Sequence, residues 1–153
     1  MLDSEATQLD GFIAKFSPEI AAMTNAVLKK MRKRYPTAQV LVYDNYNALA
    51  IGFGPSEKAG EAIFSIAVYP KWVSLFFLQA KGVPDPEGLL KGSGNVARHV
   101  VLESPRDLEI PAIAAMMEAA LEVAKTPLAE TGAGRLVIKS VSAKQRPRRP
   151  TGK

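Results

Sequence analysis

The sequence predicts a two-layer α+β sandwich, in which two main helices pack on one face of a mostly antiparallel sheet of five or six strands. Apolar residues recur at helical spacing in residues 18–35 and again in residues 108–125. Between these segments, short runs of alternating residues, separated by Gly, Asn and Pro, are typical of strands. Helices segregated from a block of strands indicate a two-layer domain and not a doubly wound nucleotide-binding fold.

Local signals place each helix. Ser17 can cap the first main helix, and Pro18 suits its first position because a helix leaves that N–H unpaired in any case. A shorter helix is expected before it, over about residues 4–15. The second main helix ends before a Thr-Pro pair that cannot continue it.

Most of the strands fall into two predicted hairpins. Residues 39–53 contain the first hairpin, with its turn at or near Asp44, and residues 62–79 contain the second. Residues 96–104 form the fifth strand. Residues 135–142 either pair as a last strand or pack as an extended arm.

The composition excludes several kinds of chemistry. The chain has no cysteine, which rules out disulfides, thiolate zinc sites and a thiol nucleophile, and which fits a reducing compartment. Its single histidine, His99, excludes multi-histidine metal sites, and no second catalytic group stands at a useful spacing. The acidic start and the lack of a long apolar run indicate neither a secretory signal nor a membrane span. We therefore expect a cytoplasmic binding protein rather than an enzyme, with no cofactor and no metal.

The positive charge of the chain is concentrated in residues 139–153. This segment holds six Lys and Arg and no acidic residue, whereas 14 Lys and Arg against 15 Asp and Glu give residues 1–138 a formal net charge of −1. We expect residues 1–138 to be a single domain, with its core in about residues 8–125, and residues 139–153 to be a disordered basic tail.

The basic tail could contact nucleic acid weakly, without sequence preference, through phosphate groups. The candidate residues are Lys144, Arg146, Arg148 and Arg149. The tail contains no aromatic residue that could stack on bases, so a purely solubilising tail explains its composition equally well.

A Gly-Ser-Gly stretch raises the question of an anion site, because glycines let backbone amides converge on a charged group. The candidate anion ligands are Lys91, Ser93, Asn95 and Arg98, with Gly92 and Gly94 shaping the backbone around them. His99 is a separate candidate, which could act as a general base or a lone metal ligand or make only a structural hydrogen bond. The stretch leads into a strand and not into a helix N-terminus, so turn geometry alone also explains the glycines. Alternation puts Arg98 and His99 on opposite faces of their strand.

Four stretches of the chain together resemble the YdhG-like domain family of bacteria, a family of unknown function. They are "LDGFIAKFSPEI", "VYDNYNALAIGF", "AVYPKWVSLFFL" and "LLKGSGNVARHVVL", and the similarity covers roughly residues 8–125. The resemblance implies a frataxin-like sandwich of two helices on one antiparallel sheet. Some members are described as frataxin-like iron chaperones, which implies iron as a partner. Such an iron surface needs clustered carboxylates, whereas the acidic residues near the first helix of this chain are thinly spread.

The two faces of the predicted sheet differ in character. Alternation directs bulky residues such as Leu49, Ile51 and Phe53 toward the helices. The other face carries small and hydroxylated residues with an aromatic rim, namely Ala50, Ala67, Tyr69, Trp72, Ser74 and Phe76. Such a patch is typical of a ligand groove or an interface, so it could bind a small ligand, a protein partner or a second copy of the chain. Arg98 or His99 would lie at its edge, unless residues 135–142 fold back and cover the patch.

Overall fold

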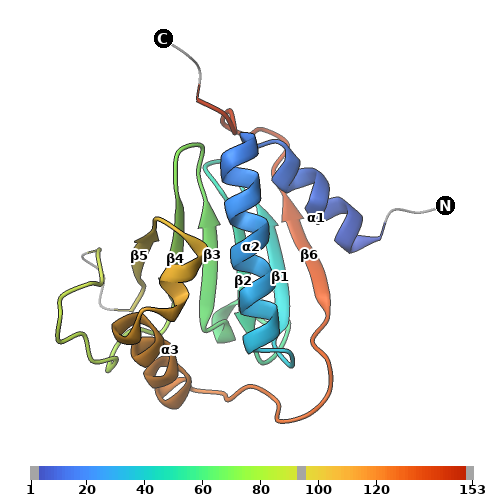
Figure 1. Cartoon of the computed structure of the whole chain (residues 1–153). Helices are drawn as coiled ribbons and strands as arrows, with labels where there is room; N and C mark the ends of the chain where they lie inside the picture. The colour runs from blue at the N-terminus through green and yellow to red at the C-terminus, as the bar shows by residue number, and fades with distance from the viewer. Residues whose placement is uncertain (1–3, 93–95, 151–153) are drawn as a thin grey trace.

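The structure, a computed structural model, describes residues 4–92 and 96–150. It is an α+β fold with helices packed on one face of an open, mostly antiparallel sheet, as the sequence predicts (Figure 1). The described elements are α1 (Glu5–Ala14), α2 (Pro18–Arg34), β1 (Gln39–Asp44), β2 (Leu49–Gly54), η1 (Ala59–Glu61), β3 (Phe64–Val68), β4 (Val73–Phe77), β5 (Arg98–Leu102), η2 (Pro105–Glu109), α3 (Pro111–Val123) and β6 (Leu136–Val141). Within the described residues, no helix is long and apolar enough to cross a membrane.

Helix α2 begins where its capping residues predict. The Ser17 hydroxyl accepts a hydrogen bond from the N–H of Ile20 at 3.3 Å, and Pro18 follows in the first turn. Val27 and Met31 of this helix are fully buried against the sheet. The cap and the apolar stripe therefore fix both the start of the helix and the side that it turns to the core.

The sheet is an antiparallel meander of five strands with one parallel strand added at its edge. Its order is β5-β4-β3-β2-β1-β6, and β6 lies parallel to β1 with Leu136 opposite Val40. The chain passes close to Ala38 on its way into β6. A Cβ atom on Gly134 would lie 1.7 Å from the carbonyl oxygen of Ala38, so only glycine fits there. Of the two alternatives left open for residues 135–142, the structure shows the strand.

The core lies between the sheet and the helices. The strand residues that alternation directs toward the helices are all buried in it: Leu49, Ile51, Phe53, Phe64, Ile66, Val68, Val73, Leu75 and Phe77. Ile113 and Met117 of α3 are buried in the same cluster, and the ring of Tyr35 stacks on Phe64 with centroids 5.2 Å apart. The predicted sidedness of the sheet is confirmed.

The connection between β2 and β3, residues 55–63, folds over the face of the sheet that is turned away from the helices. A Cβ atom on Gly54 would lie 2.8 Å from the Cα of Ala62, and one on Gly52 would lie 3.8 Å from the Ala62 Cβ. The two glycines therefore let this connection lie close to the sheet. Residues 55–63 cover part of this face, and residues 135–142 do not.

The C-terminal residues pack against the domain, which corrects the expectation of a disordered tail after residue 138. Strand β6 crosses that boundary. Beyond it, Arg148 is buried, and its guanidinium donates a hydrogen bond at 2.9 Å to the carboxylate of the buried Asp44. The low hydrophobicity of the segment favoured disorder, but a buried acidic partner on β1 gives its cation a specific place to bind.

Candidate ligand-binding site on the second face of the sheet

The face turned away from the helices, which we call the second face, carries a row of side chains across five strands. The strand register aligns Tyr43, Ala50, Ala67, Ser74 and Val101 in this row. The short side chains of the two alanines make the centre of the row shallow. At the β5 edge of the row, Val101 is 39% exposed. The row therefore forms a small-residue floor between larger neighbours.

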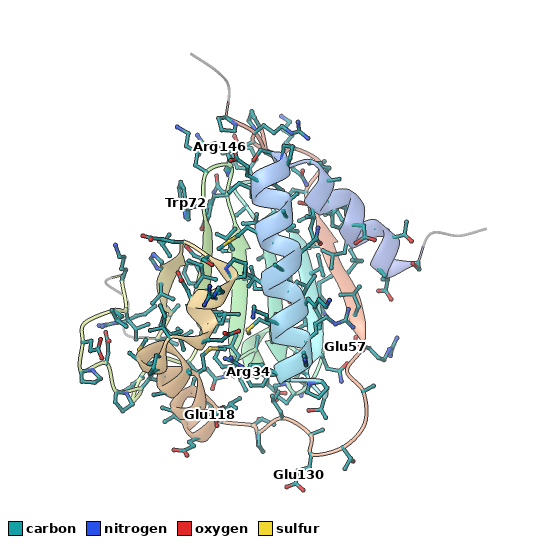
Figure 2. All side chains as sticks on the ribbon, viewed as in Figure 1. Arg34, Glu57, Trp72, Glu118, Glu130 and Arg146 are labelled. Carbon is teal, nitrogen blue, oxygen red and sulfur yellow. The ribbon has the colours of Figure 1, made fainter. Side chains whose placement is uncertain are left out.

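Two stacked ring pairs flank Ser74. Tyr69 and Trp72, at the turn between β3 and β4, stack with ring centroids 4.6 Å apart and an interplanar angle of 21°. Phe76 and His99, on β4 and β5, stack at 4.7 Å and 26°. Because side chains alternate along a strand, Ser74 lies between Trp72 and Phe76 on the same side of β4. Trp72 is 43% exposed and lies at the outer end of the hairpin (Figure 2).

The hydroxyl of Ser74 is buried and has no hydrogen-bond partner among the described residues. The whole residue is only 1% exposed. The hydroxyl of Tyr43, toward the β1 side of the same row, is also buried and without a partner in the described part of the chain. A buried polar group left without a hydrogen bond costs about 1–3 kcal/mol, and such groups are rare in native proteins. One row of the second face thus contains two hydroxyl groups without a described hydrogen-bond partner, and two alanines lie between them.

The edge of the site at β5 is polar. Lys91 is held beside His99 by two backbone hydrogen bonds, of 2.7 Å from the Lys91 N–H and 3.0 Å from the His99 N–H. Burial lowers the pKa of His99 below its ordinary value of 6.5, and the positive charge of Lys91 lowers it further. The imidazole is therefore neutral at physiological pH, with one ring nitrogen that donates and one that accepts.

The structure brings most of the predicted sheet-face residues together and separates one. Tyr69, Trp72, Ser74 and Phe76 share the second face with His99. Arg98 lies on the opposite side of β5, in the row of Phe77, as the alternation of Arg98 and His99 predicts. Of the two alternatives for the edge of the patch, Arg98 or His99, it is His99 that lies on this face.

The Gly-Ser-Gly stretch is only partly described, since Ser93, Gly94 and the following Asn95 lie outside the described residues. Gly92 has a φ of +108°, which side chains rarely permit, and a Cβ there would lie 3.8 Å from Nδ1 of His99. Turn geometry explains this glycine. An anion site at residues 91–98 stays a prediction.

Sequence reasoning missed two members of the second face, Tyr43 and Val101. A turn at or near Asp44 puts Tyr43 at the tip of the first hairpin, whereas the observed turn at residues 45–48 pairs Tyr43 with Ala50. Counting back from that turn would have assigned the face of Tyr43. Val101 follows from His99 by alternation along β5.

Two of the four residues predicted to contact nucleic acid form side-chain hydrogen bonds within the protein, and the other two are exposed. Arg148 is buried against Asp44 and cannot reach a phosphate group in this fold, which corrects its assignment. Arg149 donates at 3.1 and 3.4 Å to two carbonyl groups at the C-terminal end of α1. Lys144 and Arg146 are exposed.

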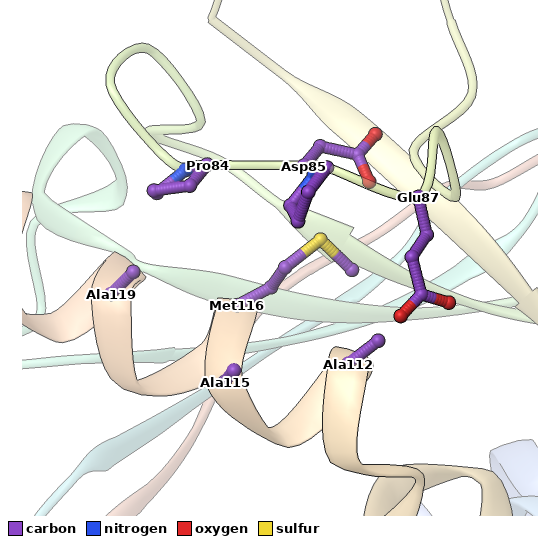
Figure 3. Close-up of a pocket in the computed structure, with 8 residues that line it drawn as sticks. Pro84, Asp85, Glu87, Ala112, Ala115, Met116 and Ala119 are labelled. Atoms are coloured by element: carbon purple, nitrogen blue, oxygen red, sulfur yellow. The ribbon is translucent and has the colours of Figure 1, made fainter.

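A cavity of about 330 Å³ lies between α3 and residues 84–87 (Figure 3). Its lining is mainly alanine, proline and the side chain of Met116. The carboxylate of Asp85 is already engaged, because it accepts hydrogen bonds from the N–H groups of Leu89 and Leu90 at 2.8 and 2.9 Å. Glu87 also lines the cavity but is exposed, so no buried, unpartnered polar group of the described residues lies in it.

No three His, Asp or Glu side chains of the described residues lie close enough together to hold a metal ion. Comparisons with protein-family models, with curated proteins and with solved structures gave no significant match to this chain. Membership of the YdhG-like family, and the iron role that it implies, therefore stay predictions from the sequence.

Proposed function

We propose that this protein is a binding protein that holds a small planar ligand on the second face of its sheet. The observation that carries the proposal is the buried hydroxyl of Ser74, unpartnered in the described residues and flanked by Trp72 and Phe76. A planar ligand with a polar edge that displaces the side chains covering Ser74 would pack on the rings and form the hydrogen bond that the Ser74 hydroxyl lacks.

The composition of the site suits this class of ligand. Binding sites for small molecules are mostly apolar, with a few polar groups that fix orientation. Here the apolar surface comes from the two stacked pairs, and the polar groups are the hydroxyls of Ser74 and Tyr43 and the neutral imidazole of His99. A planar heterocycle fits this combination better than an aliphatic chain does.

A small ligand also suits the shape of the second face better than a flat protein partner. Residues 55–63 lie on the sheet at Gly52 and Gly54, so a second copy of the face could not lie flush against it. A stable protein interface needs roughly 800 Å² on each partner. In the Ser74 row, Ser74 and Ala67 are only 1% and 6% exposed, and Val101 at the β5 edge is 39% exposed, so the row offers little open surface to a flat partner.

The proposal is tested by energy transfer from Trp72, which is the only tryptophan in the chain. The protein is titrated with anilinonaphthalene sulfonate, an aromatic dye that accepts energy from tryptophan, and then with adenosine, riboflavin and caffeine as competitors. We expect saturable transfer from Trp72, displacement by at least one heterocycle, and loss of dye binding in Ala50→Arg and Phe76→Ala. Tyr46→Ala is the matched control, because it removes an exposed ring elsewhere.

Two results would overturn the proposal. Dye binding that survives Ala50→Arg unchanged would place the dye away from the second face. A concentration-dependent dimer in sedimentation that Ala50→Arg dissociates would show that a second copy, and not a small ligand, occupies this face.

A further inference from the structure

The end of the sheet near the β1–β2 turn is built in part from residues 142–150, which we call the C-terminal strap. Its backbone is fixed at two points: the Ser142 N–H donates to the carbonyl of Asp44 at 2.8 Å, and the Arg146 N–H donates to the carbonyl of Tyr46 at 2.9 Å. The side-chain amide of Gln145 also donates to the Asp44 carbonyl, at 3.1 Å. The strap is therefore a defined part of the surface.

Positive charge exceeds negative charge at this end. The Asp44 carboxylate is buried, and it is already paired with Arg148 at 2.9 Å and with Lys15 at 3.3 Å. Lys144 and Arg146 are exposed, and neither forms an ion pair with a described acidic residue. The strap thus presents two cations whose backbone is held in place and whose charge is not neutralised locally.

Folding brings an exposed aromatic residue, Tyr46, against the backbone of the strap. Tyr46 is 52% exposed, and its carbonyl group holds the backbone of Arg146. Figure 2 shows Arg146 at this end of the molecule. The strap itself has no aromatic residue, so the combination of a ring and two cations exists only because the strap packs on the β1–β2 turn.

We propose that this end binds single-stranded nucleic acid without sequence preference, with phosphates on Lys144 and Arg146 and a base stacked on Tyr46. Cations that follow the backbone, together with exposed rings, are the usual elements of such surfaces. A duplex keeps its bases stacked inside and would leave Tyr46 without a role. This nucleic-acid site is separate from the proposed ligand site, because none of its three residues lies in the Ser74 row.

The test is the fluorescence anisotropy of labelled oligothymidylate and oligouridylate with the full chain, over a series of salt concentrations. We expect Lys144→Gln/Arg146→Gln to weaken binding at low salt and to reduce the salt slope by about 1.4, since each lost phosphate contact on a single strand contributes about 0.7. We expect Tyr46→Ala to raise Kd roughly tenfold, because stacking on one base is lost. The matched control is Lys29→Gln/Lys33→Gln, which removes the same charge from an exposed part of α2.

Three results would overturn the proposal. An equal loss of affinity in the α2 control would show that only the net charge matters. An unchanged affinity of the Tyr46→Ala variant would show that no base stacks on Tyr46. Equal competition by polyglutamate or by duplex DNA would point to an acidic protein or a duplex as the occupant. Phe76→Ala should leave oligonucleotide binding unchanged, so failure here and failure of the ligand site are distinguishable.

Discussion

Asp44 and Arg148 form a buried ion pair, 2.9 Å apart, between side chains that are 0% and 4% exposed. The two residues are 104 positions apart in the chain, so the pair ties β1 to the C-terminal strap. The guanidinium also donates to the carbonyl oxygen of Asn45 at 2.5 Å and lies over the ring of Phe16, 5.6 Å from its centroid. The strap is therefore part of the fold and not an appendage to it.

Replacing Arg148 should destabilise the protein strongly. Among the described residues, Arg148→Met leaves the buried carboxylate of Asp44 with only Lys15 as its cation, and removal of one partner of a buried pair costs about 3–5 kcal/mol. Urea unfolding followed by circular dichroism measures the change. Lys144→Met, on the exposed side of the strap, should stay within about 0.5 kcal/mol of the wild type. Equal stability of the two variants would contradict the buried pair.

Deletion of residues 143–153 should also lower the melting temperature, because it removes Arg148 together with the Gln145 hydrogen bond to Asp44. A disordered tail would instead leave the melting temperature unchanged. Differential scanning calorimetry of the truncated and full chains separates the two cases.

Substitution by arginine should affect the stability of the protein differently at the two alanines of the second face. Ala50 is half-buried, so the long side chain of Ala50→Arg can reach water, and the variant should fold. Ala67 is 6% exposed, and Ala67→Arg would bury a charge without a partner, at a cost of more than about 3 kcal/mol. Thermal melting compares the two variants. Unfolding of both would mean that this face is core and that the ligand site is wrongly placed.

Glycine at position 54 should be required by the close approach of residues 55–63. A Cβ atom there would stand 2.8 Å from the backbone of Ala62, so Gly54→Ala should cost about 1–3 kcal/mol through forced backbone shifts. Gly60→Ala is the control, since a Cβ at Gly60 meets nothing within 4 Å. If urea unfolding gave the two variants equal stability, the connection would not lie on the second face.

His99 should titrate below pH 6.5, because burial and Lys91 both disfavour its charged form. Its pKa is lower in the folded than in the unfolded chain, so its contribution to stability is present above pH 6.5 and is lost as the pH falls through the folded pKa. The ring proton signals of this single histidine can be followed directly by NMR. Lys91→Gln should raise the pKa. A pKa at or above 6.5 in the wild type would contradict the burial of the ring.

Much of the fold could be predicted because its signals are local. The cap at Ser17, the proline that follows it and the alternation in residues 49–53 depend only on neighbours in the chain, and these signals indicated the start of α2 and the core-facing set correctly. The same alternation correctly assigned Ser74 and Phe76 to the second face.

The features that could not be predicted depend on contacts between distant residues. Basic, proline-rich residues 142–150 are typical of a disordered segment, and only the buried carboxylate of Asp44 explains why they pack. The cover over Gly52 and Gly54 follows from the path of residues 55–63, for which the sequence carries no periodic signal. The parallel pairing of β6 with β1 likewise requires knowledge of where the chain goes after α3.

The location of the bound ligand is the most direct test of the proposed function. Backbone NMR spectra are recorded with and without the heterocycle that displaces the dye most strongly. The proposal predicts the largest shift changes at Ser74, Ala67 and Ala50 and in the indole signal of Trp72, with Ala112 and Ala119 of the α3 cavity unaffected. Changes centred on α3 and residues 84–87 instead, with the Ser74 row unaffected, would contradict it.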